Sequence, residues 1–336
     1  MSIPTTRLGR TGLTVSRLAL GTMTFGLQTD ETVSFQVLDK ATEAGINFLD
    51  TADAYPVPPT PETAGRTEEI IGRWLQSKGP GARRRFVIAT KAVGKVGPNP
   101  WDQGASRKHL LDAIDASLAR LQTDHVDLYQ LHSDDRTTPL DETLEALDTI
   151  VRSGRARYIG VSNFLAYRLA RAIGIAQLHE LTRLVCVQPR YSLLFREIER
   201  ELLPLAGEEG LGVIPYNPLA GGLLTGKYKA GAGPEANTRF TLGTAGSMYQ
   251  DRYWNERSFA TVAQLHALAD EAGVPLATLA VAWVMANPLI TAPLLGASRP
   301  EQLDATIAAT GYALDPALKQ RLDDVTAEYR KGDAPR

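Results

Sequence analysis

Cysteine is nearly absent from this chain of 336 residues, in which Cys186 is the only one. A single cysteine excludes an internal disulfide and any metal site that needs several thiolate ligands. Because Cys186 lies in the apolar run LVCVQ (184–188), we expect its thiol to be buried and unreactive.

Long apolar runs and dense basic tracts are also missing. No stretch approaches the roughly 20 consecutive apolar residues of a membrane-spanning helix, and the opening MSIPTTRLGR lacks the apolar core of a signal peptide. Asp and Glu (38) slightly outnumber Lys and Arg (36), so the net charge of −2 provides no electrostatic footprint for nucleic acid. The basic run 83–85 is interpreted as a solvated turn. We therefore expect a cytoplasmic protein that binds neither a membrane nor nucleic acid.

No G-x-G-x-x-G motif follows the first expected strand, which disfavours a doubly wound dinucleotide-binding sheet. What is present is an alternation of β-type runs with helical patterns, such as 32–45, where Val33, Val37, Leu38 and Ala41 share one face. The alternation is typical of an α/β protein with a parallel sheet, and eight units favour a closed (β/α)8 TIM barrel. The eight strands are expected at 17–23, 46–52, 85–91, 126–132, 158–163, 184–192, 211–217 and 290–297.

Four segments depart from this alternation. Residues 6–18 carry a Gly-centred turn between short β-type pieces, so we expect a hairpin that plugs the barrel floor. A Pro-rich loop (54–66) follows the second strand, a long excursion (219–256) follows the seventh, and two helical patterns fill 257–287. The prediction is one barrel domain over 1–336, with an N-terminal β-hairpin and extra helices and long loops at the C-terminal face.

Four polar side chains fall at or just after successive strand ends: Asp50 and Tyr55, then Lys91, then His132. Catalytic groups of βα barrels occupy this face. The set suits carbonyl reduction, in which hydride addition to carbon creates an alkoxide that needs a proton. Tyr55 would give that proton, and Lys91 would lower the Tyr55 pKa. Asp50 would hold Lys91, and His132 would orient the carbonyl oxygen.

Each of the four also has a structural interpretation when it is taken alone. Asp50 fits the cap of a turn, Tyr55 loop packing, Lys91 a solvated strand end and His132 a hydrogen-bonded structural histidine. Their joint placement favours catalysis. No paired carboxylates or metal-ligand cluster falls at the strand ends, so we expect no metal and disfavour a hydrolase. Surface roles are expected for the other histidines, which lie on helices or turns: His109, His125, His179 and His266.

The stretch AGGLLTGKY (220–228) nearly spells the G-x-x-x-x-G-K-[ST] loop that binds nucleoside triphosphates. Tyr228 stands where that loop needs a small hydroxyl ligand for Mg²⁺, so a triphosphate loop is disfavoured. The motif alone leaves open a solvated glycine turn and a cradle for a different phosphate.

Seven stretches together resemble the aldo-keto reductase superfamily, from about residue 5 to 325. The Pro-rich loop, the SNF and the GKY are similar to its bacterial, potassium-channel-β-like branch. The stretches are LDTADAY (49–55), ATK (89–91), DLYQLH (127–132), YIGVSNF (158–164), VQPRYSLL (187–194), YNPLAGGLLTGKY (216–228) and LLGASRPEQL (294–303).

The resemblance implies an eight-stranded βα barrel that binds NADPH in an extended pose without a Rossmann domain. It also implies the roles given above to Tyr55, Lys91, Asp50 and His132, with Asp50 counted among the cofactor contacts. The AGGLLTGKY stretch then becomes a cradle for the cofactor pyrophosphate, which needs no Mg²⁺ ligand at Tyr228.

Further cofactor contacts implied by the resemblance form four groups. The cofactor edge is expected to meet Thr22, Met23 and Gln28. The nicotinamide is expected to meet Ser162, Asn163 and Gln188 through its carboxamide and Tyr216 through its ring. The pyrophosphate is expected to meet Asn217, Pro218, Leu219, Gly221 and Gly222, with Lys227 and Arg239 as cations. The adenosine 2′-phosphate is expected to meet Gly296, Ser298, Arg299 and Gln302.

Three departures from the family pattern bear on function. Asn217 stands where a serine is common, and Ala305 and Thr306 replace a Glu-Asn pair that reads the adenine. Adenine contacts should be weaker, so the preference for NADPH over NADH is less firmly predicted than the fold. Residues 133–135 (Ser-Asp-Asp) replace the commoner Arg-Pro-Asp or Trp-Pro-Asp after His132, which leaves an unusual or polar substrate open.

The leading interpretation is NADPH-dependent reduction of a small aldehyde or ketone, general or dedicated to one metabolite. The alternative is an NADPH-binding subunit that senses redox state and turns over slowly, against which His132 counts. Loops 54–66, 93–106 and 229–256 should set the substrate, and Trp101 and Trp254 either wall the pocket or pack their own loops. A homo-oligomer is left open.

Overall fold

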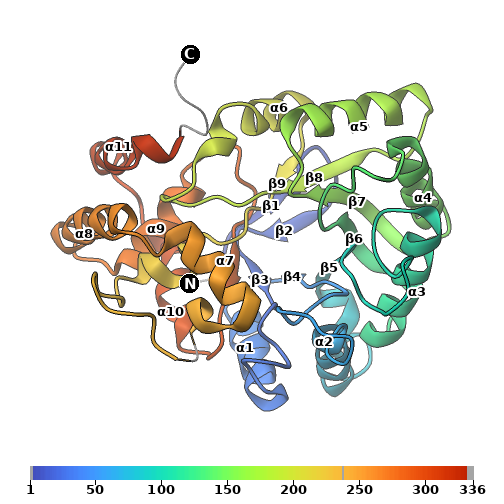
Figure 1. Ribbon diagram of the computed structural model, residues 1–336, viewed down its shortest axis with the longest axis horizontal. Helices are drawn as coiled ribbons and strands as arrows, with labels where there is room; N and C mark the ends of the chain where they lie inside the picture. Colours follow the sequence, from blue (N-terminus) through green and yellow to red (C-terminus); the bar gives the residue numbers. More distant parts are fainter. Residues whose placement is uncertain (1–2, 237, 331–336) are drawn as a thin grey trace.

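The protein is described by a computed structural model that covers residues 3–236 and 238–330. In this part of the chain, eight parallel strands form one curled sheet, and helices surround it on the outside (Figure 1). The strands are β3 (Ala19–Gly21), β4 (Phe48–Asp50), β5 (Val87–Ala92), β6 (Val126–Leu131), β7 (Ala156–Ser162), β8 (Leu184–Gln188), β9 (Gly212–Val213) and β10 (Leu294–Gly296). Their order is β10-β3-β4-β5-β6-β7-β8-β9.

The two edges of the sheet meet, so it closes as a barrel. Val213 of β9 forms a parallel bridge with Ile290, and its carbonyl accepts a hydrogen bond from the N–H of Thr291 at 2.8 Å. The N–H of Leu294 likewise donates to the carbonyl of Pro215 at 2.8 Å. The predicted (β/α)8 barrel is therefore confirmed.

The eight strands lie where the sequence placed them, but several are shorter than predicted. The expected strand at 211–217 holds only the two residues of β9, and the one at 290–297 holds only β10. Proline has no N–H to donate to a strand ladder. A proline interrupts the ladder at each of these points: Pro189 follows β8, Pro215 follows β9 and Pro293 precedes β10. The prolines account for the short strands.

The N-terminal segment forms the predicted hairpin, in which β1 (Thr5–Arg7) pairs antiparallel with β2 (Thr14–Ser16). Leu8 and Val15 are fully buried and reach into the barrel. Gly9 has φ 56°, and a Cβ there would lie 2.6 Å from a backbone carbonyl just before β9, so only glycine fits. The hairpin closes the floor over an apolar cluster that includes Ala19, Phe48, Val87, Ala89, Leu128, Cys186, Ile214 and Ala292.

Helices follow the strands as expected. The helix predicted at 32–45 is α1, and it buries Val37, Leu38 and Ala41 while Val33 is partly buried. The helices of the described chain are α1 (Glu31–Glu43), α2 (Arg66–Ser77), α3 (Arg107–Leu121), α4 (Leu140–Arg152), α5 (Ala166–Leu178), α6 (Leu202–Glu209), α7 (Gly243–Tyr253), α8 (Glu256–Glu271), α9 (Leu276–Met285), α10 (Gln302–Ile307) and α11 (Pro316–Val325). Short 3₁₀ turns are η1 (Ala82–Arg85), η2 (Glu197–Glu199), η3 (Ala220–Thr225), η4 (Arg239–Thr241), η5 (Ala308–Gly311) and η6 (Ala327–Arg330).

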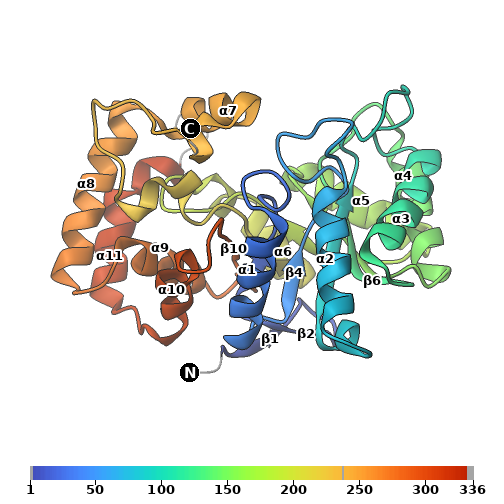
Figure 2. The ribbon, with the colours of Figure 1, turned by 90° about the horizontal axis from the view of Figure 1, so that it is seen from below.

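The excursion after β9 lies at the end of the barrel opposite the hairpin, as α7 and the β1–β2 pair show in Figure 2. It contains η3, η4 and α7, and α8 and α9 are the two helices predicted within 257–287. Within the described ranges, no single helix is long and apolar enough to cross a membrane. Helices α8 and α9 have that length and apolarity only when taken together, and they are bent by 93° relative to each other. The single domain over 1–336 stays a prediction, and its residues 1–2, 237 and 331–336 lie outside those ranges.

Candidate active site

Asp50 and Lys91 meet at the C-terminal ends of neighbouring strands β4 and β5. Lys91 Nζ lies 2.5 Å from Asp50 Oδ2 and donates to the carbonyl of Thr51 at 2.8 Å. Both side chains are buried, with exposed fractions of 0% and 1%, so each charge depends on the other for its compensation. Burial lowers the pKa of Lys91, and Asp50 opposes that effect.

Two glutamines complete the surroundings of Asp50. Its Oδ1 accepts hydrogen bonds from Gln188 Nε2 at 2.8 Å and from Gln130 Nε2 at 3.2 Å. Gln188 was predicted, as a cofactor contact, whereas Gln130 was missed. Gln130 lies on β6, two residues before His132, so the two side chains are expected on the same face. This spacing could have identified Gln130 from the sequence.

Tyr55 lies between Lys91 and His132. The Lys91 Nζ is 5.0 Å from the centroid of the Tyr55 ring, and the ring centroids of Tyr55 and His132 are 5.5 Å apart in an edge-on arrangement. Burial and then the Asp50 carboxylate raise the pKa of Tyr55 well above its usual range. The net shift is therefore opposite to the lowering expected from Lys91, because burial is the largest effect on the Tyr55 hydroxyl.

His132 is held as a neutral imidazole. Burial, with a smaller effect of the Lys91 ammonium, lowers the pKa of His132 from the usual 6.5 to about 3. Its backbone is fixed on both sides, since its N–H donates to the carbonyl of Ala92 at 2.8 Å and its carbonyl accepts from Asn163 Nδ2 at 2.9 Å. A neutral imidazole carries one N–H donor and one acceptor nitrogen.

The residues predicted to hold the nicotinamide carboxamide form one hydrogen-bonded group. Asn163, with φ 59°, accepts at Oδ1 from the hydroxyl of Tyr216 at 2.8 Å. Ser162 Oγ donates to the carbonyl of Gln188 at 2.8 Å. In the described part of the chain, no donor reaches Gln188 Oε1, which leaves an acceptor for an amide N–H. This free acceptor fits the N–H side of a carboxamide, while the N–H and O–H donors of Asn163 and Ser162 are engaged within the group.

The stretch that nearly spelled a triphosphate loop follows β9 and forms η3. Its backbone is left-handed at Gly221 (φ 70°) and Gly222 (φ 99°). Pro218 is buried and Leu219 partly buried at its start. A Cβ on Gly222 would meet only the Tyr228 ring, at 3.8 Å, so the backbone stays open to close approach. An open turn of this kind fits a phosphate group.

Asn217 links this turn to α7. Its backbone is left-handed (φ 65°), its Nδ2 donates to the Tyr253 hydroxyl at 2.9 Å, and its Oδ1 accepts from the N–H of Gly221 at 2.6 Å. A serine hydroxyl is too short to make both contacts. The substitution that departs from the family pattern thus fastens the helix to the turn.

The two residues that end the AGGLLTGKY motif have different surroundings. Tyr228 packs edge-on against Phe240 and Trp254, with ring centroids 5.2 Å away in each case. Lys227 is exposed, and its Nζ lies 4.8 Å from the Tyr228 centroid. Trp254 therefore packs its own segment rather than walling a pocket, whereas Trp101 is 51% exposed. The Tyr228 ring builds an aromatic cluster beside the turn.

The first loop also reaches the site. Thr22 Oγ1 donates to the carbonyl of Asp50 at 2.9 Å. Met23 Sδ lies 3.7 Å from Arg239 Nη1, which connects this loop to η4. Gln28 is partly buried in the same loop.

The residues predicted at the 2′-phosphate surround the start of α10. Gln302 Oε1 accepts from the N–H of Ser298 at 2.9 Å and from its hydroxyl at 3.3 Å. Arg299 is exposed, with no ion pair among residues 3–236 and 238–330, and a Cβ on Gly296 would meet nothing within 4 Å. Thr306 is buried and donates to the carbonyl of Leu303 at 3.0 Å, so its hydroxyl does not face this space.

Asp134 and Asp135, which follow His132, both form hydrogen bonds within the structure. Asp134 accepts from Arg168 at 2.9 Å, so it holds α5. Despite burial, hydrogen bonds from Thr137, Thr138 and the N–H of Ala105 hold the pKa of Asp135 well below its usual range. These two acids therefore hold the loop after β6, and the effect of residues 133–135 on the substrate stays a prediction.

Two surface assignments also change. His109, expected at the surface, is only 3% exposed on α3, where burial lowers its pKa. Arg83, expected to be solvated, forms a partly buried ion pair with Asp127 at 2.7 Å. Amphipathic spacing does not tell which polar residue a neighbouring element will cover.

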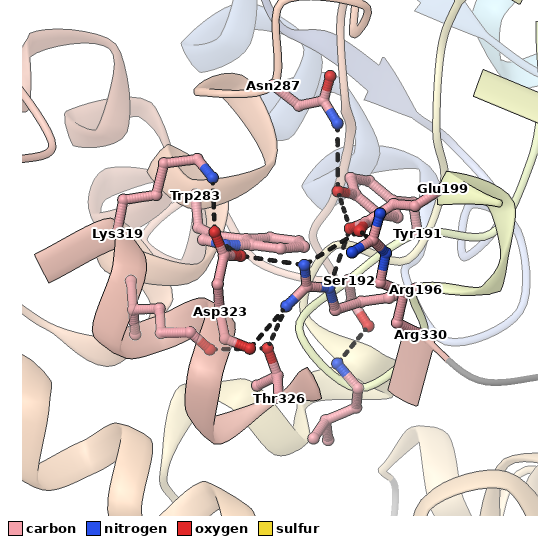
Figure 3. Close-up of polar contacts among 12 residues, drawn as sticks. Tyr191, Ser192, Arg196, Glu199, Trp283, Asn287, Lys319, Asp323, Thr326 and Arg330 are labelled. Atoms are coloured by element: carbon pink, nitrogen blue, oxygen red, sulfur yellow. Dashed lines mark hydrogen bonds and ion pairs between the residues drawn. The ribbon is translucent and has the colours of Figure 1, made fainter. Parts of the chain in front are cut away.

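A hollow of about 270 Å³ lies between the segment after β8 and helices α9 and α11, away from the candidate active site (Figure 3). None of the predicted site residues lines it. Arg196 pairs with Glu199 at 2.9 Å and with Asp323 at 3.1 Å, and Lys319 pairs with Asp323 at 2.7 Å. These charges compensate one another, and the ion pairs connect α11 to the segment after β8. Over the described ranges, no group of three His, Cys, Asp or Glu side chains could hold a metal ion.

Comparison with known proteins gives a consistent result. A profile of the Aldo/keto reductase family matches residues 17–327. The chain is 43% identical to the "Uncharacterized oxidoreductase YrpG" of Bacillus subtilis, with 95% of each chain covered. It is 36% identical to the "Probable voltage-gated potassium channel subunit beta" of Arabidopsis thaliana, also with 95% of each covered. It is 34% identical to the "L-glyceraldehyde 3-phosphate reductase" of Escherichia coli, over 90% of this chain and 86% of that one.

Proposed function

Because this chain belongs to the aldo/keto reductase family, we propose that it reduces an aldehyde or ketone to the alcohol with NADPH as the hydride donor. Oxidoreductases among the similar proteins support a redox reaction, and one of them is named for an aldehyde substrate. The observation that carries the proposal is the Tyr55 ring held between the Lys91 ammonium and the neutral His132 imidazole. A cytoplasmic location belongs to the same proposal.

The protein side of the reaction is the delivery of one proton. With its pKa raised by burial, Tyr55 is protonated at neutral pH, so its hydroxyl can donate to the carbonyl oxygen as negative charge develops there. His132 contributes a neutral N–H that orients the same oxygen. The Lys91 ammonium, held by Asp50, stabilises the phenolate that remains until solvent returns the proton.

The residues present fit NADPH, which when bound supplies the hydride to the carbonyl carbon. Gln188 Oε1, Ser162 and Asn163 would hold the carboxamide, and Tyr216 the ring. The open backbone at Gly222 would receive the pyrophosphate, with Lys227 and Arg239 as cations. On the first loop, the residues that would line the cofactor are Thr22, Met23 and Gln28. After β9 they are Asn217, Pro218, Leu219 and Gly221. The 2′-phosphate would meet Gly296, Ser298, Arg299 and Gln302.

The proposal is tested by NADPH oxidation with a panel of aldehydes and ketones. Wild type should reduce some of them, and Tyr55→Phe should lose roughly 10²–10⁴ in turnover because it cannot give the proton. Tyr167→Phe is the matched control, since Tyr167 is 58% exposed on α5 and should leave turnover unchanged. Equal turnover by wild type and Tyr55→Phe would remove the proposed role of Tyr55.

A regulatory subunit is the second candidate, favoured by the relative named as a potassium channel β subunit. Such a protein would bind NADPH tightly and turn over slowly. The neutral His132 beside Tyr55 counts against it, because an orienting donor serves catalysis rather than binding. Tight NADPH binding by fluorescence titration, together with no reduction of any carbonyl in the panel, would favour the regulatory function.

A further inference from the structure

Three arginines near the catalytic end of the barrel have no carboxylate partner among residues 3–236 and 238–330: Arg190, Arg239 and Arg252. All three are partly buried. Arg196, by contrast, pairs with Glu199 and Asp323. A partly buried cation without a counter-ion is costly, so it indicates a place where an anion binds.

Aromatic rings contact all three arginines, and the guanidinium carbon of Arg239 lies 5.4 Å from the Tyr249 centroid. The guanidinium carbon of Arg190 lies 3.5 Å from the Phe195 centroid and 6.0 Å from that of Tyr253. The guanidinium of Arg252 lies 6.0 Å from the Tyr249 centroid, and the Tyr249 and Tyr253 centroids are 6.3 Å apart. Both cations therefore sit on one tyrosine pair of α7, with their N–H groups left for another partner.

This tyrosine pair adjoins the residues that receive cofactor and substrate. Arg190 forms a parallel backbone bridge with Tyr216, and the Tyr253 hydroxyl accepts from Asn217. Burial raises the pKa of Tyr216 and raises that of Tyr253 to about 12, while the charges of Arg190 and Arg252 oppose both shifts. Both cations thus lie close enough to Tyr216 and Tyr253 to affect them, and Tyr216 in turn affects the pKa of Tyr55.

We propose that Arg190 and Arg252 bind an oxyanion carried by the substrate, so that the preferred substrates are carbonyl compounds with a carboxylate or phosphate group. The carbonyl would meet Tyr55, and the oxyanion would meet the two guanidinium groups beside Tyr216. Guanidinium forks match both oxyanions in two-point hydrogen bonds, and aromatic stacking reduces the entropy that is lost on binding. This inference rests on the proposed reduction. Arg239 keeps its proposed role as a cation at the cofactor pyrophosphate.

The test compares matched aldehydes that differ in charge. One pair is para-formylbenzoate and its methyl ester, and the other is para-formylphenyl phosphate and para-methoxybenzaldehyde. For wild type, kcat/KM should be higher for the anionic member by roughly tenfold or more, the effect of a hydrogen bond to a charged group. Arg190→Gln and Arg252→Gln should each reduce that ratio several-fold through KM. Arg171→Gln, an exposed arginine on α5, should leave it unchanged.

Two further measurements keep this inference separate from the proposed function. The NADPH dissociation constant of each variant shows whether the arginines serve the cofactor instead. Benzoate and phenyl phosphate binding to the NADPH complex, measured by calorimetry, needs no turnover, so it tests the anion site even if no aldehyde is reduced. Weaker binding of either ligand in Arg190→Gln and Arg252→Gln supports the proposal, and the ligand affected identifies the oxyanion. An unchanged ratio and unchanged ligand binding, or a loss of NADPH affinity alone, would overturn it.

Discussion

Two layers of side chains fill the barrel, and the same four strands provide both. The lower layer is apolar and contains Phe48, Ala89, Leu128 and Cys186. Two residues further along each strand, the upper layer contains Asp50, Lys91, Gln130 and Gln188, which are joined by hydrogen bonds and an ion pair. Side chains two apart on a strand share a face, so the layers are in direct contact.

The difference between the layers shows how the fold makes the site reactive. The apolar layer keeps water out, so burial shifts the pKa of the groups above it: Lys91 and His132 downward and Tyr55 upward. Cys186 lies at the boundary, where burial and then Asp50 raise the pKa of its thiol, in keeping with the predicted unreactive cysteine. The two layers thus differ in function: the lower one contributes to stability alone, whereas the upper one contributes to both stability and reactivity.

The largest effect is expected from breaking the upper layer at Lys91. Lys91→Met leaves Asp50 buried without a cation, which should cost about 3–5 kcal/mol in the free energy of unfolding. Carbonyl reduction should fall by roughly 10²–10⁴ because the phenolate is no longer stabilised. Urea unfolding and steady-state turnover measure the two effects. The double variant Lys91→Met/Asp50→Leu should recover stability but not turnover. Wild-type turnover by Lys91→Met alone would contradict the account.

A cavity in the lower layer should affect stability alone. Phe48→Ala removes a fully buried ring beneath Asp50 and should cost about 3–5 kcal/mol in unfolding free energy. The KM for the aldehyde should stay close to that of wild type, measured on the folded fraction. If the loss of unfolding free energy is accompanied by a clear rise in KM, the lower layer also affects substrate binding and the two layers do not act separately.

A smaller effect is expected where β7 meets β8. A Cβ on Gly160 would clash with Cys186 Sγ and lie 3.0 Å from the Cys186 carbonyl oxygen, so Gly160→Ala should cost about 1–3 kcal/mol through overpacking. Removing the sulfur in the double variant Gly160→Ala/Cys186→Ala should recover most of the loss. Thermal unfolding of the single and double variants measures this, and equal losses in both would show that the sulfur is not the obstacle.

The last effect is confined to acidic pH and is due to His132. Unfolded, this histidine binds a proton below its usual pKa of 6.5, whereas in the folded protein it does so only below about 3. Stability is therefore fully present above 6.5 and is lost as pH falls toward 3, by about 1 kcal/mol per pH unit. His132→Gln should flatten the urea-unfolding profile in this window, and exposed His179→Gln should not. Parallel profiles for all three proteins would refute the assignment.

The sequence predicted the positions of the strands well because apolar runs and their alternation are local properties. It also predicted that Asp50, Tyr55, Lys91 and His132 would meet, since strand ends in a barrel share one face. The direction of the Tyr55 pKa shift was not predicted because it depends on burial and on the Asp50 carboxylate, which spacing along the chain does not reveal. Arg190 and Arg252 were missed as a pair, because only the folded α7 brings them to one tyrosine pair.

The central claim is that Tyr55 gives the proton for hydride transfer to a carbonyl. The most direct measurement is a single turnover with NADPH that carries deuterium at its transferable position, with the alcohol analysed by mass spectrometry. We predict one deuterium on the carbinol carbon with wild type and only a trace with Tyr55→Phe over the same time. Bound NADPH with no deuterated alcohol from any aldehyde, or equal labelling by both proteins, would contradict the account.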